Sequence, residues 1–148
     1  MNIPFSPPDI SQAEIDSVVE TLKSGWITTG PKTKKFEDEI SEYIGTEKSA
    51  CLSSATASME MTLRLLGIGP GDEVIVPAYT YTASCSVICH VGAEPVMVDI
   101  CKDQQVMDLD LMEKAITDRT KAIIAVDLAG IILSLIHISE PTRRTPIS

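Results

Sequence analysis

Three short segments of the sequence carry residues suited to holding an anion or a flat ring, and each is predicted to end a strand and open a helix. In the first, residues 51–58, small and hydroxyl side chains precede a helix that we expect to begin at about Thr56. Small side chains let backbone N–H groups approach a phosphate, and a helix N-terminus adds partial positive charge. Ser54 and Thr56 can add hydroxyl donors. An ordinary Ser/Thr helix cap without a ligand is the alternative, and on composition alone it is the more frequent one.

The other two segments place an aromatic pair and a carboxylate at strand ends. Tyr79 and Tyr81 follow residues 73–77 in a chain that is only 4% aromatic, and a tyrosine at such a crevice can stack on a planar ligand ring. A tyrosine in a hydrophobic staple or in the core is the alternative, slightly favoured by the pattern alone. Asp127 follows residues 122–126, where it can face the same crevice or serve as a helix cap or turn residue. Together the segments predict a phosphorylated aromatic cofactor.

A sheet must bring these segments together, and the sequence predicts one. We expect strands over residues 49–53, 73–77, 95–100 and 122–126, with helices over 56–66, 80–91 and 109–116 between them. This alternation is typical of β-α-β units, so it predicts an α/β fold with a mainly parallel sheet covered on both faces. In such a sheet, ligands bind beyond the carboxyl ends of the strands.

Two helices are expected before the sheet. Ser11 and Glu14 have the spacing of a capping box, apolar residues follow at helical intervals, and Gly25 ends the first helix. A turn over residues 26–31 leads to a second helix, which carries an apolar face and ends at Gly45.

The charge of the chain excludes two classes of partner. A net charge of −9 argues against binding nucleic acid or an anionic membrane surface, both of which favour a basic patch. The basic run Lys32, Lys34 and Lys35 is followed directly by acidic residues, so we interpret it as a solvated helix face. No stretch reaches the roughly 18 apolar residues of a membrane span.

The cysteines and histidines show no metal-binding pattern. The four cysteines contain no C-x-x-C pair and the chain has only two histidines, so no zinc pattern is present. No segment at the N-terminus has the form of a secretory signal. We therefore expect a cytoplasmic protein with reduced cysteines.

The α/β pattern breaks after Ile132. Residues 133–143 match the in-frame translation of a transposase-based sequencing-library adapter. We therefore predict that residues 1–132 form the natural part of the chain and that 133–148 are an adapter-encoded tail, as in a fusion scar. A genuine C-terminal strand and tail is the alternative.

Several motifs in fixed order resemble one known family. They are GWITTGP at 25–31, SSATA at 53–57, LGIGPGDEVIVP at 66–77, YTY at 79–81, VGAEPV at 91–96 and TKAII at 120–124. Each is weak alone, but as a set, from about residue 3 to 132, they resemble the DegT/DnrJ/StrS-type aminotransferases.

The resemblance implies a fold, an activity and a cofactor. Family members are fold-type-I enzymes that use pyridoxal 5′-phosphate (PLP), usually as homodimers. Most transfer an amino group from glutamate to a keto carbon of a nucleotide-sugar. Residues 1–132 would then be the N-terminal part of the large, PLP-binding domain.

The resemblance also implies roles for individual residues. The backbone around Ala55 and Thr56, with Ser54 beside it, would hold the cofactor phosphate, and Tyr81 would stack on the pyridine ring. Asp127 is assigned to the same cofactor site from its strand-end position. The turn that contains Trp26, Thr28 and Thr29 would lie near the entrance for the sugar-nucleotide.

The sequence departs from the family pattern in two ways. Ala55 stands where many relatives have Gly, which is a small change. More importantly, neither the family's segment with the aspartate that pairs with the pyridine nitrogen nor the segment with the catalytic lysine is found. Lys121 opens a strand, far from its carboxyl end, and does not replace that lysine. We therefore name no catalytic residue and expect this chain to be inactive.

Two alternatives to the aminotransferase remain. Relatives in which histidine replaces the lysine are sugar dehydratases of the same fold, so the missing segment decides between the two reactions. The other alternative is a non-catalytic, nucleotide-binding α/β domain.

Overall fold

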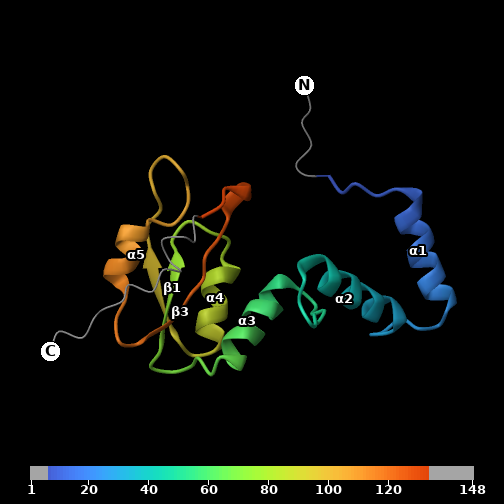
Figure 1. Cartoon of the computed structure of the whole chain (residues 1–148), viewed down its shortest axis with the longest axis horizontal. Coiled ribbons are helices and arrows are strands. Elements are labelled where there is room, and N and C mark those ends of the chain that lie inside the picture. The colour runs from blue at the N-terminus through green and yellow to red at the C-terminus, as the bar shows by residue number, and fades with distance from the viewer. Residues whose placement is uncertain (1–6, 134–148) are drawn as a thin grey trace. The chain divides into compact units, whose positions relative to one another are not determined.

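Figure 1 shows a computed structural model of the chain, in which the structure describes residues 7–133. These residues divide into two compact units, of which the first ends at Cys51 and the second begins at Leu52.

The first unit contains two helices, α1 (Gln12–Lys23) and α2 (Pro31–Ile44). The predicted capping box is confirmed, because the Ser11 backbone N–H donates to Glu14 Oε2 over 2.6 Å and the Ser11 hydroxyl caps the helix in return. Gly45 ends α2 with a φ of +75°, a left-handed conformation that glycine adopts without strain.

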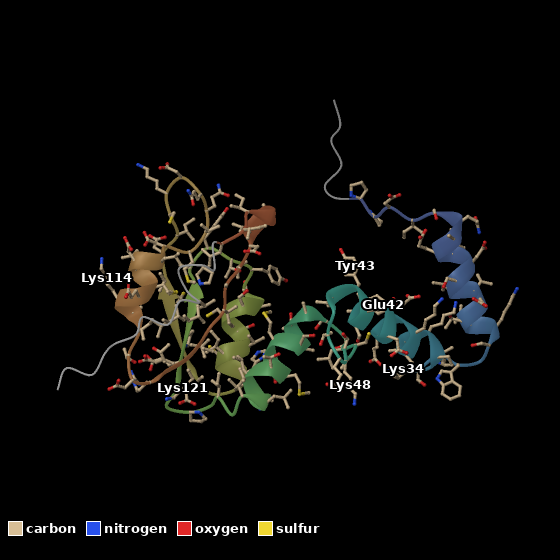
Figure 2. All side chains as sticks on the ribbon, viewed as in Figure 1. Lys34, Glu42, Tyr43, Lys48, Lys114 and Lys121 are labelled. Atoms are coloured by element: carbon tan, nitrogen blue, oxygen red, sulfur yellow. The ribbon has the colours of Figure 1, made fainter. Side chains whose placement is uncertain are left out.

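Lys32 connects the two helices of this unit. Its Nζ donates to Glu20 Oε2 over 2.7 Å and to the Ser17 hydroxyl and carbonyl over 2.9 and 3.1 Å. The expectation of a solvated face is therefore incomplete for this lysine. The expectation of a solvated face is confirmed for the other two lysines of the run. Each forms an exposed ion pair with a carboxylate one helical turn later, Lys34 with Asp38 and Lys35 with Glu39. Lys34 is labelled in Figure 2.

The second unit is an α/β layer structure. Its elements are α3 (Ala55–Leu65), β1 (Glu73–Pro77), α4 (Ala83–His90), β2 (Glu94–Val98), α5 (Leu109–Ala115), β3 (Thr120–Ile123) and the 3₁₀ turn η1 (Leu128–Gly130). The three strands form one sheet in the order β2-β1-β3, and both pairings are parallel. The predicted fold class is thus confirmed.

Side chains of β1 alternate between the two faces of the sheet. Val74 and Val76 belong to an apolar cluster with residues of α3 and α4, whereas Ile75 belongs to a second cluster with Met112 of α5. All three β1 side chains have no exposed surface. Figure 1 shows α4 and α5 on opposite sides of the strands. Helices on both faces explain why β1 is a continuous apolar run.

The predicted strand over residues 49–53 is wrong. In the described part of the chain this segment joins no sheet. Its polar groups bind α2 instead: the Cys51 N–H donates to Glu37 Oε1 over 2.9 Å, and the hydroxyls of Ser41 and Ser49 lie 3.0 Å apart. A strand needs a neighbouring backbone to pair with, and here side chains of a helix take that place.

Leu133, the first residue of the predicted tail, packs into the second unit. Leu133 is 3% exposed and belongs to the apolar cluster on the α5 side of the sheet, with Ile75 and Val98. Leu133 is therefore part of this core, and the adapter origin of residues 133–148 stays a prediction. Residues 134–148 lie outside the described part of the chain.

The described helices are short, and the longest, α2, has 14 residues. Between residues 7 and 133, no helix combines the length with the apolar character that crossing a bilayer requires.

Candidate functional site

The predicted cofactor residues of the second unit gather at one end of its sheet. β1 and β3 are neighbours and parallel, and a backbone bond of 2.8 Å from Ile124 N to Ile75 O continues their pairing. The segment with Tyr81 follows β1 and the segment with Asp127 follows β3, so both leave the carboxyl edge. Figure 1 shows α3 ending where β1 starts, so the helix runs back along the sheet and its N-terminus points towards the same edge. Carboxyl edges of parallel sheets are the usual place for ligands.

The N-terminus of α3 has donors for an anion. The hydroxyl of Ser54 accepts from the Ala57 N–H over 3.1 Å, so Ser54 is the helix cap that the alternative interpretation foresaw. The first N–H groups of a helix have no acceptor within it. Those of Ala55 and Thr56 form no hydrogen bond within residues 7–133, and Ala55 is exposed. Two backbone donors beside a small side chain fit a phosphate group.

Tyr81 presents an uncovered ring on a fixed backbone. Its side chain is 80% exposed, and that of Tyr79 is 56% exposed, so the alternative of a core tyrosine is wrong. The Tyr81 carbonyl accepts from the Ser84 N–H over 3.0 Å, which ties the residue to the first turn of α4. The buried Ser84 hydroxyl lies 3.1 Å from the Thr80 hydroxyl and holds the same turn. Sequence reasoning missed this hydroxyl pair, although its i, i+4 spacing was a signal.

Asp127 has a structural role in addition to any contact with a ligand. Its Oδ1 accepts from the Leu133 N–H over 2.9 Å, so the carboxylate closes the turn that contains η1. The residue is exposed, and no second partner of its side chain is found among residues 7–133. One carboxylate oxygen is therefore available at the sheet edge.

In the first unit, the turn between α1 and α2 borders a pocket of about 350 Å³. The indole Nε1 of Trp26 donates to the Thr29 carbonyl over 2.8 Å, so Thr29 contributes its backbone and Trp26 forms a wall. The residues that line the pocket are Glu20, Thr21, Ser24, Trp26, Ile27, Thr28, Gly30, Pro31, Lys32 and Thr33. Sequence reasoning placed the turn over residues 26–31 at the sugar-nucleotide entrance and named Trp26, Thr28 and Thr29, but it missed Lys32.

Comparison with known proteins identifies the family. Residues 8–147 match the sequence profile of the DegT/DnrJ/EryC1/StrS aminotransferase family. The chain belongs to this family. The matched range extends past Leu133, into the segment for which an adapter origin is predicted, and that origin stays a prediction.

Individual members of the family are similar over nearly all of this chain. A UDP-4-amino-4-deoxy-L-arabinose–oxoglutarate aminotransferase from Shewanella sediminis is 46% identical over 145 residues, or 98% of this chain and 37% of that protein. The protein Spr1654 from Streptococcus pneumoniae, assigned as a sugar aminotransferase, is 64% identical, with a TM-score of 0.90 over 93% of this chain and 35% of that one. DesV of S. venezuelae is 40% identical, with a TM-score of 0.81 over 86% of this chain and 34% of its own.

The chain thus spans little more than a third of these family members. Solved forms of Spr1654 include one with PLP and one with its aminated form, PMP. The fold class expected from the resemblance, that of fold-type-I enzymes, agrees with these structural relatives. The expectation that this chain is the N-terminal part of such an enzyme stays a prediction.

The residues assigned from the family resemblance fall into the two units. Tyr81 and Asp127 follow the carboxyl ends of β1 and β3, and Ser54, Ala55 and Thr56 lie at the N-terminus of α3. Trp26, Thr28 and Thr29 belong to the first unit.

Lys121 lies away from the candidate cofactor site. It is exposed at the beginning of β3, and its Nζ donates to the Asp118 carbonyl over 3.3 Å. Figure 2 shows it at the end of the sheet opposite to η1. The expectation that this lysine is not catalytic agrees with its place in the fold.

Two titratable groups of the second unit are shifted for structural reasons. Hydrogen bonds from Arg64 and then from His90 lower the pKa of Glu60, and the three side chains join α3 to α4. Burial, together with the nearby Cys89 thiol, raises the pKa of Cys85. A raised pKa keeps this thiol neutral, so Cys85 is unsuited to act as a nucleophile.

Proposed function

We propose that the protein to which this chain belongs is a PLP-dependent aminotransferase that acts on a nucleotide-linked keto-sugar, with glutamate as amino donor. The observation that carries the proposal is that the N-terminus of α3 is open and that Tyr81, which follows β1, has an uncovered ring. The family and the names of its relatives give the reaction class.

The cofactor phosphate would bind the backbone N–H groups of Ala55 and Thr56. These donors need no rearrangement, because the Ser54 hydroxyl already fixes the first turn of α3 by capping it. The partial positive charge of the helix N-terminus favours a dianionic phosphate there. When bound, PLP supplies the electron sink for bond changes at the substrate carbon.

The ring of the cofactor would stack on Tyr81. Tyr81 is 80% exposed, and an aromatic ring stacked on its side chain would remove apolar surface from water. Asp127 would accept a hydrogen bond with the carboxylate oxygen that the Leu133 N–H does not occupy.

The pocket beside Trp26 would receive part of the sugar-nucleotide. Its wall combines an indole face with the hydroxyls of Thr28 and Thr33, which suits a ring that carries polar substituents. The whole protein would act as a homodimer, as the family resemblance implies, and in the cytoplasm, as its cysteine content favours.

The experiment is to read the coding DNA beyond the codon for Ile132 in its source and to express the protein that it encodes. A lysine in the family's lysine segment, with glutamate-dependent amination of a UDP-linked 4-keto-sugar and release of 2-oxoglutarate, supports the proposal. A histidine at that place assigns the sugar dehydratase instead. A reading frame without PLP-dependent turnover of either kind contradicts the proposal.

A matched pair of variants tests the cofactor site in that protein. Tyr81→Ala removes the proposed stacking face and is expected to weaken PLP binding by about tenfold, the equivalent of about 1.4 kcal/mol. Tyr79→Ala removes another exposed tyrosine two residues away and serves as the control. Equal losses in both variants would contradict the assignment of Tyr81.

A further inference from the structure

The indole of Trp26 lies directly against the backbone of Gly30. A Cβ atom built on Gly30 would overlap the Cδ1 and Nε1 atoms of the ring and would come within 2.9 Å of Cγ. The indole Nε1–H, on the same edge of the ring, donates to the Thr29 carbonyl over 2.8 Å. The ring is therefore held to residues 29–30 by one hydrogen bond and by the absence of a side chain.

The backbone at this position does not itself require glycine. Gly30 has φ −152° and ψ −161°, an extended conformation that other residues also adopt. The following Pro31 favours such an extended residue before it. The requirement for glycine thus comes from the contact with the indole and not from the turn.

We infer that Gly30 is a positioning residue for Trp26, and that through this ring it sets the shape of the pocket between α1 and α2. Trp26 and Gly30 both line that pocket, together with Ile27 and Pro31. Any side chain at position 30 displaces the ring from its place and removes one wall. What the pocket receives rests on the proposed function, whereas the position of the ring does not.

The chain offers a direct readout, because Trp26 is its only tryptophan. In the full 148-residue chain, the indole is expected to show a near-ultraviolet circular dichroism band and restricted rotation by fluorescence anisotropy. A freely rotating indole in the unaltered chain overturns the inference, and this measurement needs no variant.

The variant Gly30→Ala adds one methyl group where the ring lies. Its emission is expected to shift to the red, and quenching by acrylamide is expected to rise about twofold, because a displaced indole is open to solvent on both faces and moves freely. Far-ultraviolet circular dichroism should be unchanged, since an extended backbone accepts alanine.

The matched control is Gly69→Ala. Its added Cβ would lie 3.7 Å from the Val91 carbonyl, an ordinary contact, so Trp26 emission should not change. Unchanged emission in Gly30→Ala, or the same change in both variants, overturns the inference. The fluorescence experiment uses no ligand, so a negative result would not contradict the proposed aminotransferase activity. Likewise, a lack of turnover by the longer protein would not contradict the role of Gly30.

Discussion

The backbone N–H of Leu133 donates a hydrogen bond of 2.9 Å to Oδ1 of Asp127, while the Leu133 side chain is buried in the α5 side of the sheet. This contact joins the carboxylate assigned to the cofactor site with the first residue assigned to the foreign tail. Asp127 therefore stabilises the end of the described chain, whatever it also binds.

Removal of the Leu133 side chain tests its place in the core. Leu133→Ala is expected to lower the free energy of unfolding by about 2–3 kcal/mol, because it leaves a cavity beside Ile75. Ile132→Ala, one residue earlier and 79% exposed, should change it by less than about 0.5 kcal/mol. Urea unfolding of both variants measures the difference, and equal effects would show that Leu133 is not part of the core.

The buried carboxylate of Glu73 is expected to matter more for stability than the exposed one of Glu94. Glu73 is 4% exposed, accepts from the Thr117 hydroxyl over 2.5 Å and pairs with Arg119. Glu73→Ala leaves these donors without a buried partner and should cost about 1–3 kcal/mol.

Glu94 provides the control for Glu73, because it also faces Arg119. Its oxygen lies 3.4 Å from the guanidinium, and its side chain is 64% exposed. Exposed pairs of this kind contribute about 0–1 kcal/mol, so Glu94→Ala should have little effect on urea unfolding. A larger loss in Glu94→Ala than in Glu73→Ala would contradict the ranking.

Acid is expected to weaken the connection between α3 and α4. Hydrogen bonds from Arg64 and His90 lower the pKa of Glu60 below its ordinary value of 4.5. A lowered folded-state pKa means that this carboxylate stabilises the fold above pH 4.5 and that the contribution is lost as the pH falls below that value.

Glu60→Gln replaces the carboxyl group with an amide that does not titrate. The stability difference between the unaltered chain and Glu60→Gln should therefore be largest near neutral pH and should shrink as the pH falls through the window below 4.5. Urea unfolding at a series of pH values measures it. Glu113→Gln, an exposed substitution on α5, is the control and should show no such convergence.

The chain of 148 residues is expected to transfer no amino group by itself. The family's lysine segment and its aspartate segment are both absent, and loss of such groups costs several orders of magnitude in rate. Incubation with PLP, reduction with borohydride and mass spectrometry measure covalent attachment. A stoichiometric adduct on one lysine, such as Lys121, would contradict the expectation.

Local patterns in the sequence determined much of this protein. The capping box of Ser11 and Glu14, the glycine that ends α2 and the β1 run are each decided by neighbours in the chain, so their spacing was sufficient to predict them. The motif order likewise predicted the family, because those motifs recur together.

Only the tertiary structure decided the contacts of residues 49–53, of Leu133 and of the pair Gly30 and Trp26. Residues 49–53 look like a strand, but the carboxylate of Glu37, 14 residues before Cys51, takes its N–H and leaves no ladder to form. Leu133 looks foreign in sequence, yet the space between β1 and α5 accepts its side chain. Gly30 and Trp26 are both visible in the sequence, but no local rule reports that a ring folds back onto a glycine. Burial and close contact depend on which distant segments meet in space, and that is a property of the whole fold.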